Sequence, residues 1–223
     1  LNGYGCNQDM DLARSCFKQA ISIDDKNATA MVNLGNTYDS TLYPSADDKK
    51  KAYKWYKRAA ELQDAKGLFN VANCLHYGNG VKKNHKKAFK IFKKIYKDSR
   101  DAEATFHLGL YYQEGLWVKK NLKKAHKYYS EAAKMGDAYS NTHLGVMYAT
   151  GNGVKKDLKE AMKYYKKAAR LGDTLAVTNI AYMYEKGEGV KKDKKKAIQL
   201  YQKAAAQDEE YAIKALKRIR KKG

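Results

Sequence analysis

The chain has 223 residues, of which 43% are hydrophobic and 31% are charged, and its formal net charge at pH 7 is +21. Its apolar residues recur at regular intervals, which excludes a disordered chain, and no apolar run is long enough to span a bilayer. Its 39 lysines outnumber six arginines, which argues against sequence-specific nucleic-acid recognition, because arginine supplies the planar fork used for bidentate contacts.

The first 27 residues are expected to form a partial repeat. Gly3-Tyr4-Gly5-Cys6 matches a Gly-x-Gly-Val loop that recurs later in the chain, so this first repeat begins without its first helix. We therefore expect the chain to be a fragment or a processed form, with any targeting signal upstream.

The three cysteines, Cys6, Cys16 and Cys74, show no Cys-x-x-Cys spacing, and an odd number does not form a closed disulfide framework. We expect them to be helix-packing residues of a protein from a reducing intracellular compartment, the cytoplasm or an organelle interior. The secretory pathway is not excluded, because the N-terminus looks incomplete.

A seven-residue motif recurs along the chain, beginning at Gly78, Gly115, Gly151 and Gly187. In each copy one Val and two lysines precede an Asn or Asp. The Val residues are 37, 36 and 36 positions apart, a period typical of stacked helix pairs. The sequence therefore predicts repeats over residues 28–64, 65–101, 102–137, 138–173 and 174–209, closed by a capping helix over 210–223. Together they are expected to form one all-α, α/α superhelical solenoid domain.

The repeat over 138–173 shows the local pattern most clearly. Residues 138–149 carry apolar side chains at helical spacing, which predicts a first helix, helix A, and Gly145 is expected to let another backbone approach it closely. Glycines follow where helix A must end. Asp157, with Glu160 three residues later, predicts a capping box at the start of a second helix, helix B, which ends near residue 171.

The pattern Leu-Gly-x-x-Tyr-x-x-Gly-x-Gly-Val-x-x-Asp, followed by Ala-x-x-Tyr-Tyr-x-x-Ala-Ala-x-x-Gly, closely resembles the Sel1-like repeat (SLR) family, relatives of the tetratricopeptide repeats. The resemblance covers nearly the whole chain and recurs about five times. It implies a right-handed α/α superhelix that serves as an adaptor or scaffold in multiprotein complexes. It implies no catalytic residues.

The candidate motifs for chemistry are weak. Ser15-Cys16-Phe17-Lys18 spells the Ser-x-x-Lys acylation motif, but the chain has neither Ser-Asp-Asn nor Lys-Thr-Gly to accompany it. The five histidines show no zinc-binding spacing. We therefore expect no enzymatic activity, no metal and no cofactor.

A polar column recurs two residues before the small residue of each helix A, at Asn33, Asn70, His107, His143 and Asn179. Three residues later on the same face stand Asn36, Asn73, Leu110, Val146 and Tyr182. In the tetratricopeptide superfamily helix A lines the concave groove, and an Asn at the equivalent position often bonds a bound peptide's backbone. The resemblance thus implies a partner-binding groove, and the alternative is that these groups only satisfy hydrogen bonds between repeats.

A pair of lysines recurs in the loop that precedes each helix B, and these pairs are expected to form a basic edge: Lys82, Lys83, Lys119, Lys120, Lys155, Lys156, Lys191 and Lys192. The alternative is an ordinary solvated surface. Because the charge excess is larger than solubility requires, the edge favours a partner with an acidic surface, nucleic acid or anionic lipid.

The leading functional hypothesis is a non-catalytic scaffold that binds partner proteins through the groove and the basic edge. One alternative is an RNA-associated structural protein of a large ribonucleoprotein assembly, with lysines on phosphates. Another is an activating or anchoring subunit of a membrane complex. Helix-B aromatics that look buried favour a protein partner over RNA.

Overall fold

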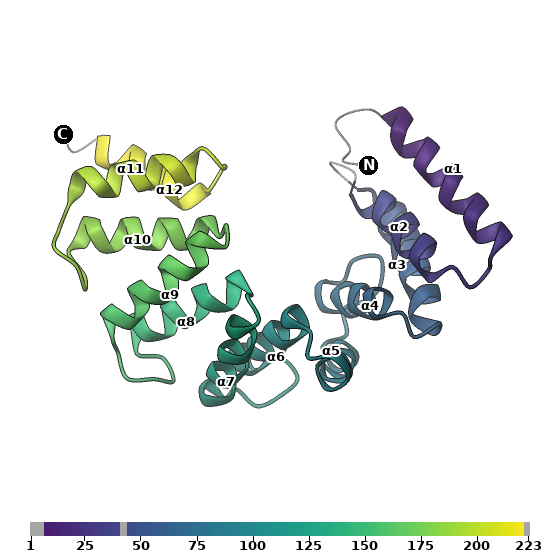
Figure 1. Cartoon of the computed structure of the whole chain (residues 1–223), viewed down its shortest axis with the longest axis horizontal. Helices are drawn as coiled ribbons and strands as arrows, with labels where there is room; N and C mark the ends of the chain where they lie inside the picture. The colour runs from purple at the N-terminus through teal and green to yellow at the C-terminus, as the bar shows by residue number, and fades with distance from the viewer. Residues whose placement is uncertain (1–6, 41–43, 221–223) are drawn as a thin grey trace. The chain divides into compact units, whose positions relative to one another are not determined.

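The computed structural model describes residues 7–40 and 44–220, and these residues form twelve α-helices and no strand (Figure 1). Their bounds are α1 (Asn7–Ile23), α2 (Ala28–Asp39), α3 (Ala46–Glu61), α4 (Ala65–Tyr77), α5 (His85–Ser99), α6 (Ala102–Glu114), α7 (Leu122–Lys134), α8 (Ala138–Thr150), α9 (Leu158–Arg170), α10 (Thr174–Lys186), α11 (Lys194–Ala205) and α12 (Glu210–Arg220). The predicted all-α fold of helix pairs is confirmed. In each pair the A helix is α2, α4, α6, α8 or α10, and the B helix is the next one.

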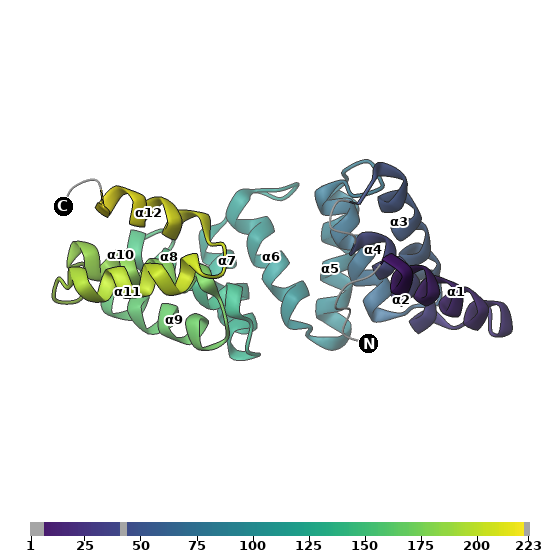
Figure 2. The ribbon, with the colours of Figure 1, turned by 90° about the horizontal axis from the view of Figure 1, so that it is seen from above.

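The chain divides into two compact units, Leu1–Arg100 and Asp101–Gly223. The division falls one residue before the predicted boundary between the repeats over 65–101 and 102–137. Within each unit every helix packs on the next helix along the chain, so each helix pair contacts only its neighbours (Figures 1 and 2). The final helix, α12, packs on α11 in the position predicted for the cap.

The turn from helix A to helix B has the same structure in four repeats. Each helix A ends at a glycine with positive φ, such as Gly151 at 80°, a conformation that costs glycine little. The capping residue of helix B then donates its backbone N–H to a carbonyl of helix A, as Asp157 does to Tyr148 at 2.9 Å. The recurring Gly and Asp or Asn therefore fix the loop that carries the lysine pairs.

The capping box predicted at Asp157 is only half formed. The Asp157 side chain accepts from the backbone N–H of Lys159 and of Glu160, at 2.9 and 3.0 Å. The Glu160 carboxylate binds Lys163 instead, and the backbone N–H that it was expected to reach is already bonded to Tyr148. A complete capping box occurs at the start of α3, between Ser45 and Asp48.

The close approach predicted at Gly145 is made by a ring and not by a backbone. A Cβ added at Gly145 would lie 2.4 Å from Cε1 of Tyr165 on helix B of the same repeat. Gly109 stands in the same relation to Tyr129, at 2.6 Å. The missing Cβ thus provides the space in which the tyrosine of helix B is buried.

The cysteine prediction is right in one place and wrong in another. Cys74 is a buried free thiol, and burial raises its pKa to about 12. Cys16 is also free, but it is exposed on α1 and does not pack in a helix interface. Cys6 and the Gly-x-Gly match at residues 3–5 lie outside the described residues.

Candidate functional site

The two helices of each pair differ sharply in charge. Lys66 and Lys186 are the only lysines or arginines in the five A helices, whereas every B helix carries at least four lysines. The exposed side of the A helices is therefore neutral to acidic, and the positive charge is concentrated on the B helices and the loops before them. A ligand of the predicted groove would therefore contact a surface with little positive charge, whereas a ligand of the basic edge would contact lysines.

Three asparagines of the polar column keep their amides available. Asn33 on α2, Asn70 on α4 and Asn179 on α10 are each half-buried. None of the three forms a side-chain hydrogen bond with another residue of the described ranges 7–40 and 44–220. A side-chain amide can both donate and accept, as a peptide backbone requires.

The two histidines of the column are instead held by neighbouring side chains. Nδ1 of His143 lies 3.2 Å from Oε1 of Gln113. The His143 ring also stacks on the Tyr129 ring, with ring centroids 4.9 Å apart. Burial lowers the pKa of His143, which favours the neutral ring. His107 is buried and meets the ring of Phe106 edge-on. For the histidines, structural packing is the better interpretation.

The residues three positions after the polar column also differ from one another in their hydrogen bonds. Asn36 is exposed, and its Oδ1 accepts from the Tyr56 hydroxyl at 2.9 Å. Asn73 occupies the equivalent position on α4, but the aromatic residue of α5 at the place of Tyr56 is Phe92, which has no hydroxyl. Oδ1 of Asn73 is buried and has no hydrogen-bond partner among the described residues.

Exposed apolar residues, which the sequence analysis did not single out, flank the polar column in the second unit. Tyr139 on α8, Leu175 on α10 and Tyr211 on α12 are 62%, 48% and 54% exposed, and they recur every 36 residues. Val146 and Tyr182 stand seven residues after Tyr139 and Leu175, on the same helix face. The 36-residue spacing was a signal available in the sequence. We call the residues Tyr139, His143, Val146, Leu175, Asn179, Tyr182 and Tyr211 the A-helix face.

A shallow hollow adjoins the A-helix face. It has a volume of about 330 Å³ and is lined by Ala138, Tyr139, Leu171, Gly172, Asp173 and Thr174. The hollow lies where the loop after α9 meets the first turn of α8. The Thr142 hydroxyl on α8 donates to the carboxylate of Asp173, which caps α10, so these two A helices are tied together beside the hollow. The Thr178 hydroxyl on α10 donates in the same way to Glu209, just before α12.

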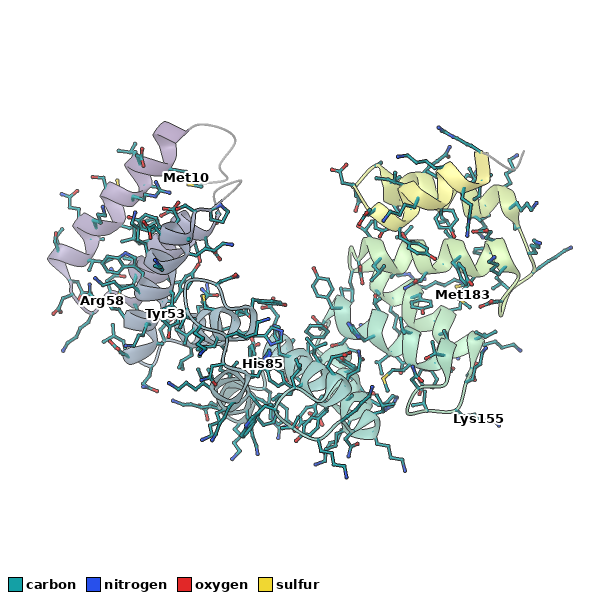
Figure 3. The ribbon with its side chains drawn as sticks, turned by 180° about the vertical axis from the view of Figure 1, so that it is seen from behind. Met10, Tyr53, Arg58, His85, Lys155 and Met183 are labelled. Atoms are coloured by element: carbon teal, nitrogen blue, oxygen red, sulfur yellow. The ribbon has the colours of Figure 1, made fainter. Side chains whose placement is uncertain are left out.

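All eight lysines of the predicted basic edge are exposed, one pair in each of four loops. Lys155 lies in the loop between α8 and α9 and points away from the helices (Figure 3). The Cβ of the second lysine of a pair lies beside the glycine that ends helix A, as that of Lys120 does beside Gly115. A second hollow of about 470 Å³ lies at this loop, lined by Tyr112, Val118, Lys119, Lys120, Asn121 and Lys124.

The described residues contain no group of three or more His, Cys, Asp or Glu side chains placed to hold a metal ion. Among the same residues, no helix combines the length and the apolar character that crossing a membrane requires.

Comparison with solved structures places the chain among SLR proteins. A Sel1 repeat protein from Oxalobacter formigenes is 30% identical, with a TM-score of 0.77 over 94% of this chain and 87% of that one. The protein c5321, a protective antigen present in uropathogenic Escherichia coli strains that displays an SLR fold, is 28% identical, with a TM-score of 0.72 over 91% of this chain and 43% of that one. No curated protein matches the chain.

The Sel1 repeat family model matches residues 1–25, 28–64, 65–98, 102–137, 138–173 and 174–209. Five of these matches fall on the helix pairs α2–α3, α4–α5, α6–α7, α8–α9 and α10–α11 of the structure. The chain belongs to the Sel1 repeat family.

Proposed function

We propose that this protein is a non-catalytic scaffold that binds an extended segment of a partner protein on its A-helix face. Sel1 repeat proteins are generally scaffolds for protein interactions, and the family is non-catalytic. The observation that carries the proposal for this chain is the arrangement around Asn179. Its amide makes no side-chain hydrogen bond within the described residues, and it stands between Leu175 and Tyr182 on one helix face.

This arrangement suits an extended peptide. A peptide needs polar groups for its backbone and apolar surface for alternate side chains. The Asn179 amide supplies a polar group for the peptide backbone. The apolar surface comes from the partly exposed Leu175, Tyr139 and Val146. Each hydrogen bond to the peptide would contribute on the order of 1 kcal/mol, and burial of the apolar side chains would contribute the larger part.

The charge distribution refines the expected partner. The A helices carry few positive charges, so an acidic part of the partner would contact the lysine loops and not the A-helix face. Such rim charges mainly increase the rate of association. The bound segment itself is therefore expected to be polar and apolar, with acidic residues flanking it.

The half-buried tyrosines beside the lysines support a protein partner over RNA. Tyr112 stacks on Tyr128 with an interplanar angle of 6°, and Tyr148 stacks on Tyr164 with an angle of 8°. Lys124 also lies over the Tyr112 ring, 5.0 Å from its centroid. Ring faces that single-stranded RNA would use for base stacking are thus already in contact with the protein.

The test is selection of peptides from a displayed library on the full chain, followed by titration of the selected peptides against variants. Leu175→Glu and Asn179→Ala are expected to weaken binding by about tenfold or more, and the thermal transition in circular dichroism should stay near that of the unmodified protein. Lys155→Gln with Lys156→Gln, in the loop of the preceding repeat, is the matched comparison: it should slow association with peptides that carry acidic flanks and leave their dissociation rate unchanged.

Two results would contradict the proposal. In one, the selected peptides keep full affinity for both A-helix variants. The other result comes from a second experiment, in which the immobilised protein captures partners from a cell extract. The proposal is contradicted if nuclease treatment of the extract abolishes this capture.

A further inference from the structure

The strongest concentration of positive charge lies on and just before α5. Between residues 82 and 97 the chain has eight lysines and no acidic residue: Lys82, Lys83, Lys86, Lys87, Lys90, Lys93, Lys94 and Lys97. All eight are exposed. We call them the α5 lysine surface.

Packing of α5 turns its six lysines to one side. The helix buries Ala88, Phe89, Phe92 and Ile95. At 100° per residue, Lys86, Lys87, Lys90, Lys93, Lys94 and Lys97 project within an arc of about 120° on the opposite side. From Lys86 to Lys97 the row is about 16 Å long at 1.5 Å per residue. Long, flexible stems allow all six ammonium groups to reach one plane tangent to the helix.

Lys94 donates to Oε1 of Gln63 at 2.5 Å, and four of the six lysines on α5 are not paired with a carboxylate of the described residues. Lys87, Lys90, Lys93 and Lys97 form no ion pair with any described residue. The preceding B helix, α3, differs, because Lys50, Lys51 and Lys57 each pair with a carboxylate of their own helix. The positive field at α5 also acts on its neighbours, since burial and the charge of Lys83 together lower the pKa of His85.

We propose that the α5 lysine surface binds the face of an anionic phospholipid bilayer. Four to eight basic residues on one amphipathic helix suit the negative potential of such a leaflet, where each lysine near the surface strengthens binding by about fivefold. No large hydrophobic side chain is exposed among residues 82–99. Attachment is therefore peripheral and electrostatic, without insertion of a side chain into the lipid. This inference does not depend on the function of the A-helix face.

The shape of the surface favours a bilayer over the other polyanions. The six lysines of α5 lie within one arc of the helix surface, and their flexible stems let the charges reach a common plane, as a flat, laterally mobile array of headgroups requires. A nucleic-acid site would be expected to combine such charges with exposed aromatic rings or arginine forks, and residues 82–97 offer neither exposed aromatic side chains nor arginine. Lysine, a point charge without preferred direction, suits headgroups that rearrange beneath it.

The experiment is co-sedimentation of the full chain with large vesicles. Vesicles of phosphatidylcholine mixed with phosphatidylserine should carry the protein down, and vesicles of phosphatidylcholine alone should not. Added salt should release it, because screening weakens attraction between exposed charges. Replacement of Lys87, Lys90, Lys93 and Lys97 by Gln, a residue of similar helix propensity, should lower the partition coefficient by roughly 600-fold, about fivefold for each lysine.

A second variant separates a local site from net charge. Replacement of Lys191, Lys194, Lys195 and Lys203 by Gln removes the same charge from α11 and its preceding loop, where the helix face is interrupted by Gln199 and Gln202. This variant should retain most of the binding. The inference is overturned if the two variants lose binding equally, or if phosphatidylcholine vesicles bind as well.

Competition tests the other polyanions. Single-stranded RNA, duplex RNA and poly-glutamate are each added to protein that is bound to the mixed vesicles. Release by any of them at a lower charge concentration than that of competing small phosphatidylserine vesicles that do not sediment would overturn the lipid assignment and identify the favoured polyanion. Failure of all three to release the protein preferentially supports the bilayer.

Discussion

Gly145 provides a sharp test of the packing between the two helices of a repeat. A Cβ at this position would lie 2.4, 2.5 and 3.0 Å from Cε1, Cδ1 and Cζ of Tyr165. Ordinary carbon contacts are about 3.5 to 4.0 Å, so the ring must retreat by roughly 1 Å. Tyr165 is only 4% exposed and is enclosed by a cluster that includes Ala161 and Met183, so it cannot move away freely.

The expected cost depends on the size of the new side chain. Gly145→Leu adds a branched side chain to this space, and overpacking of this kind costs about 1 to 3 kcal/mol or more. Removal of a mid-helix glycine returns about 1 kcal/mol of helix propensity. Because the Leu branch displaces the ring from its cluster, the overpacking cost should lie at the upper end of this range, which leaves a net loss of about 2 kcal/mol in the free energy of unfolding.

Gly145→Ala is the matched control. Ala181 holds the same position in the next repeat and shares a buried cluster with Tyr201, so one methyl group can be accommodated there. Gly145→Ala introduces only the Cβ, so its loss should be smaller than that of Gly145→Leu, about 1 kcal/mol or less after the gain in helix propensity. Urea unfolding followed by circular dichroism measures both variants. An unchanged midpoint for Leu, or an equal loss for Ala and Leu, would refute the assigned packing.

Two further predictions concern groups buried in the first unit. Phe92→Tyr should stabilise the protein by about 1 kcal/mol, because the new hydroxyl can donate to Oδ1 of Asn73 as the Tyr56 hydroxyl does to Asn36. The gain should vanish when Asn73→Ala is added. A gain that persists in the double variant would exclude this hydrogen bond. Burial, with His85 and Lys83, lowers the pKa of His76 to about 4, so the unfolded state takes up a proton first as the pH falls. The free energy of unfolding should therefore decrease between about pH 6.5 and pH 4, on the order of 2 kcal/mol, and His76→Gln should flatten this dependence in urea titrations at several pH values.

The repeat period predicted the helices and their boundaries well because each boundary has its own local chemistry. A glycine with positive φ ends helix A, and an Asp or Asn side chain caps helix B in the next turn. Such signals act over a few residues and are visible in the sequence. The capping box at Asp157 failed because the backbone N–H that Glu160 was expected to bind had a better partner on helix A, which only the folded loop brings near.

The polar column was harder to interpret from the sequence. Asn179 and His143 occupy equivalent positions, so the period alone assigns them the same role. The difference arises from other elements: Gln113 on α6 and Tyr129 on α7 hold the His143 ring, and the described residues offer Asn179 no such partner. Whether a polar group is satisfied depends on residues about 30 positions away, and a repeat pattern does not specify them.

In a repeat array the same position recurs in each helix pair, so the residue type at that position is repeated along one face of the stacked helices. A lysine pair in each of four repeats charges the loop before helix B, whereas the A helices carry few basic residues, so these loops and the A helices suit different ligands. Within such an array, specificity must come from the places where a repeat departs from its neighbours. Here they are the apolar row of Tyr139, Leu175 and Tyr211, confined to the second unit, and the uninterrupted lysines of α5 in the first. Changes at these departures should alter binding with little effect on the fold, whereas changes at the shared glycines should do the reverse.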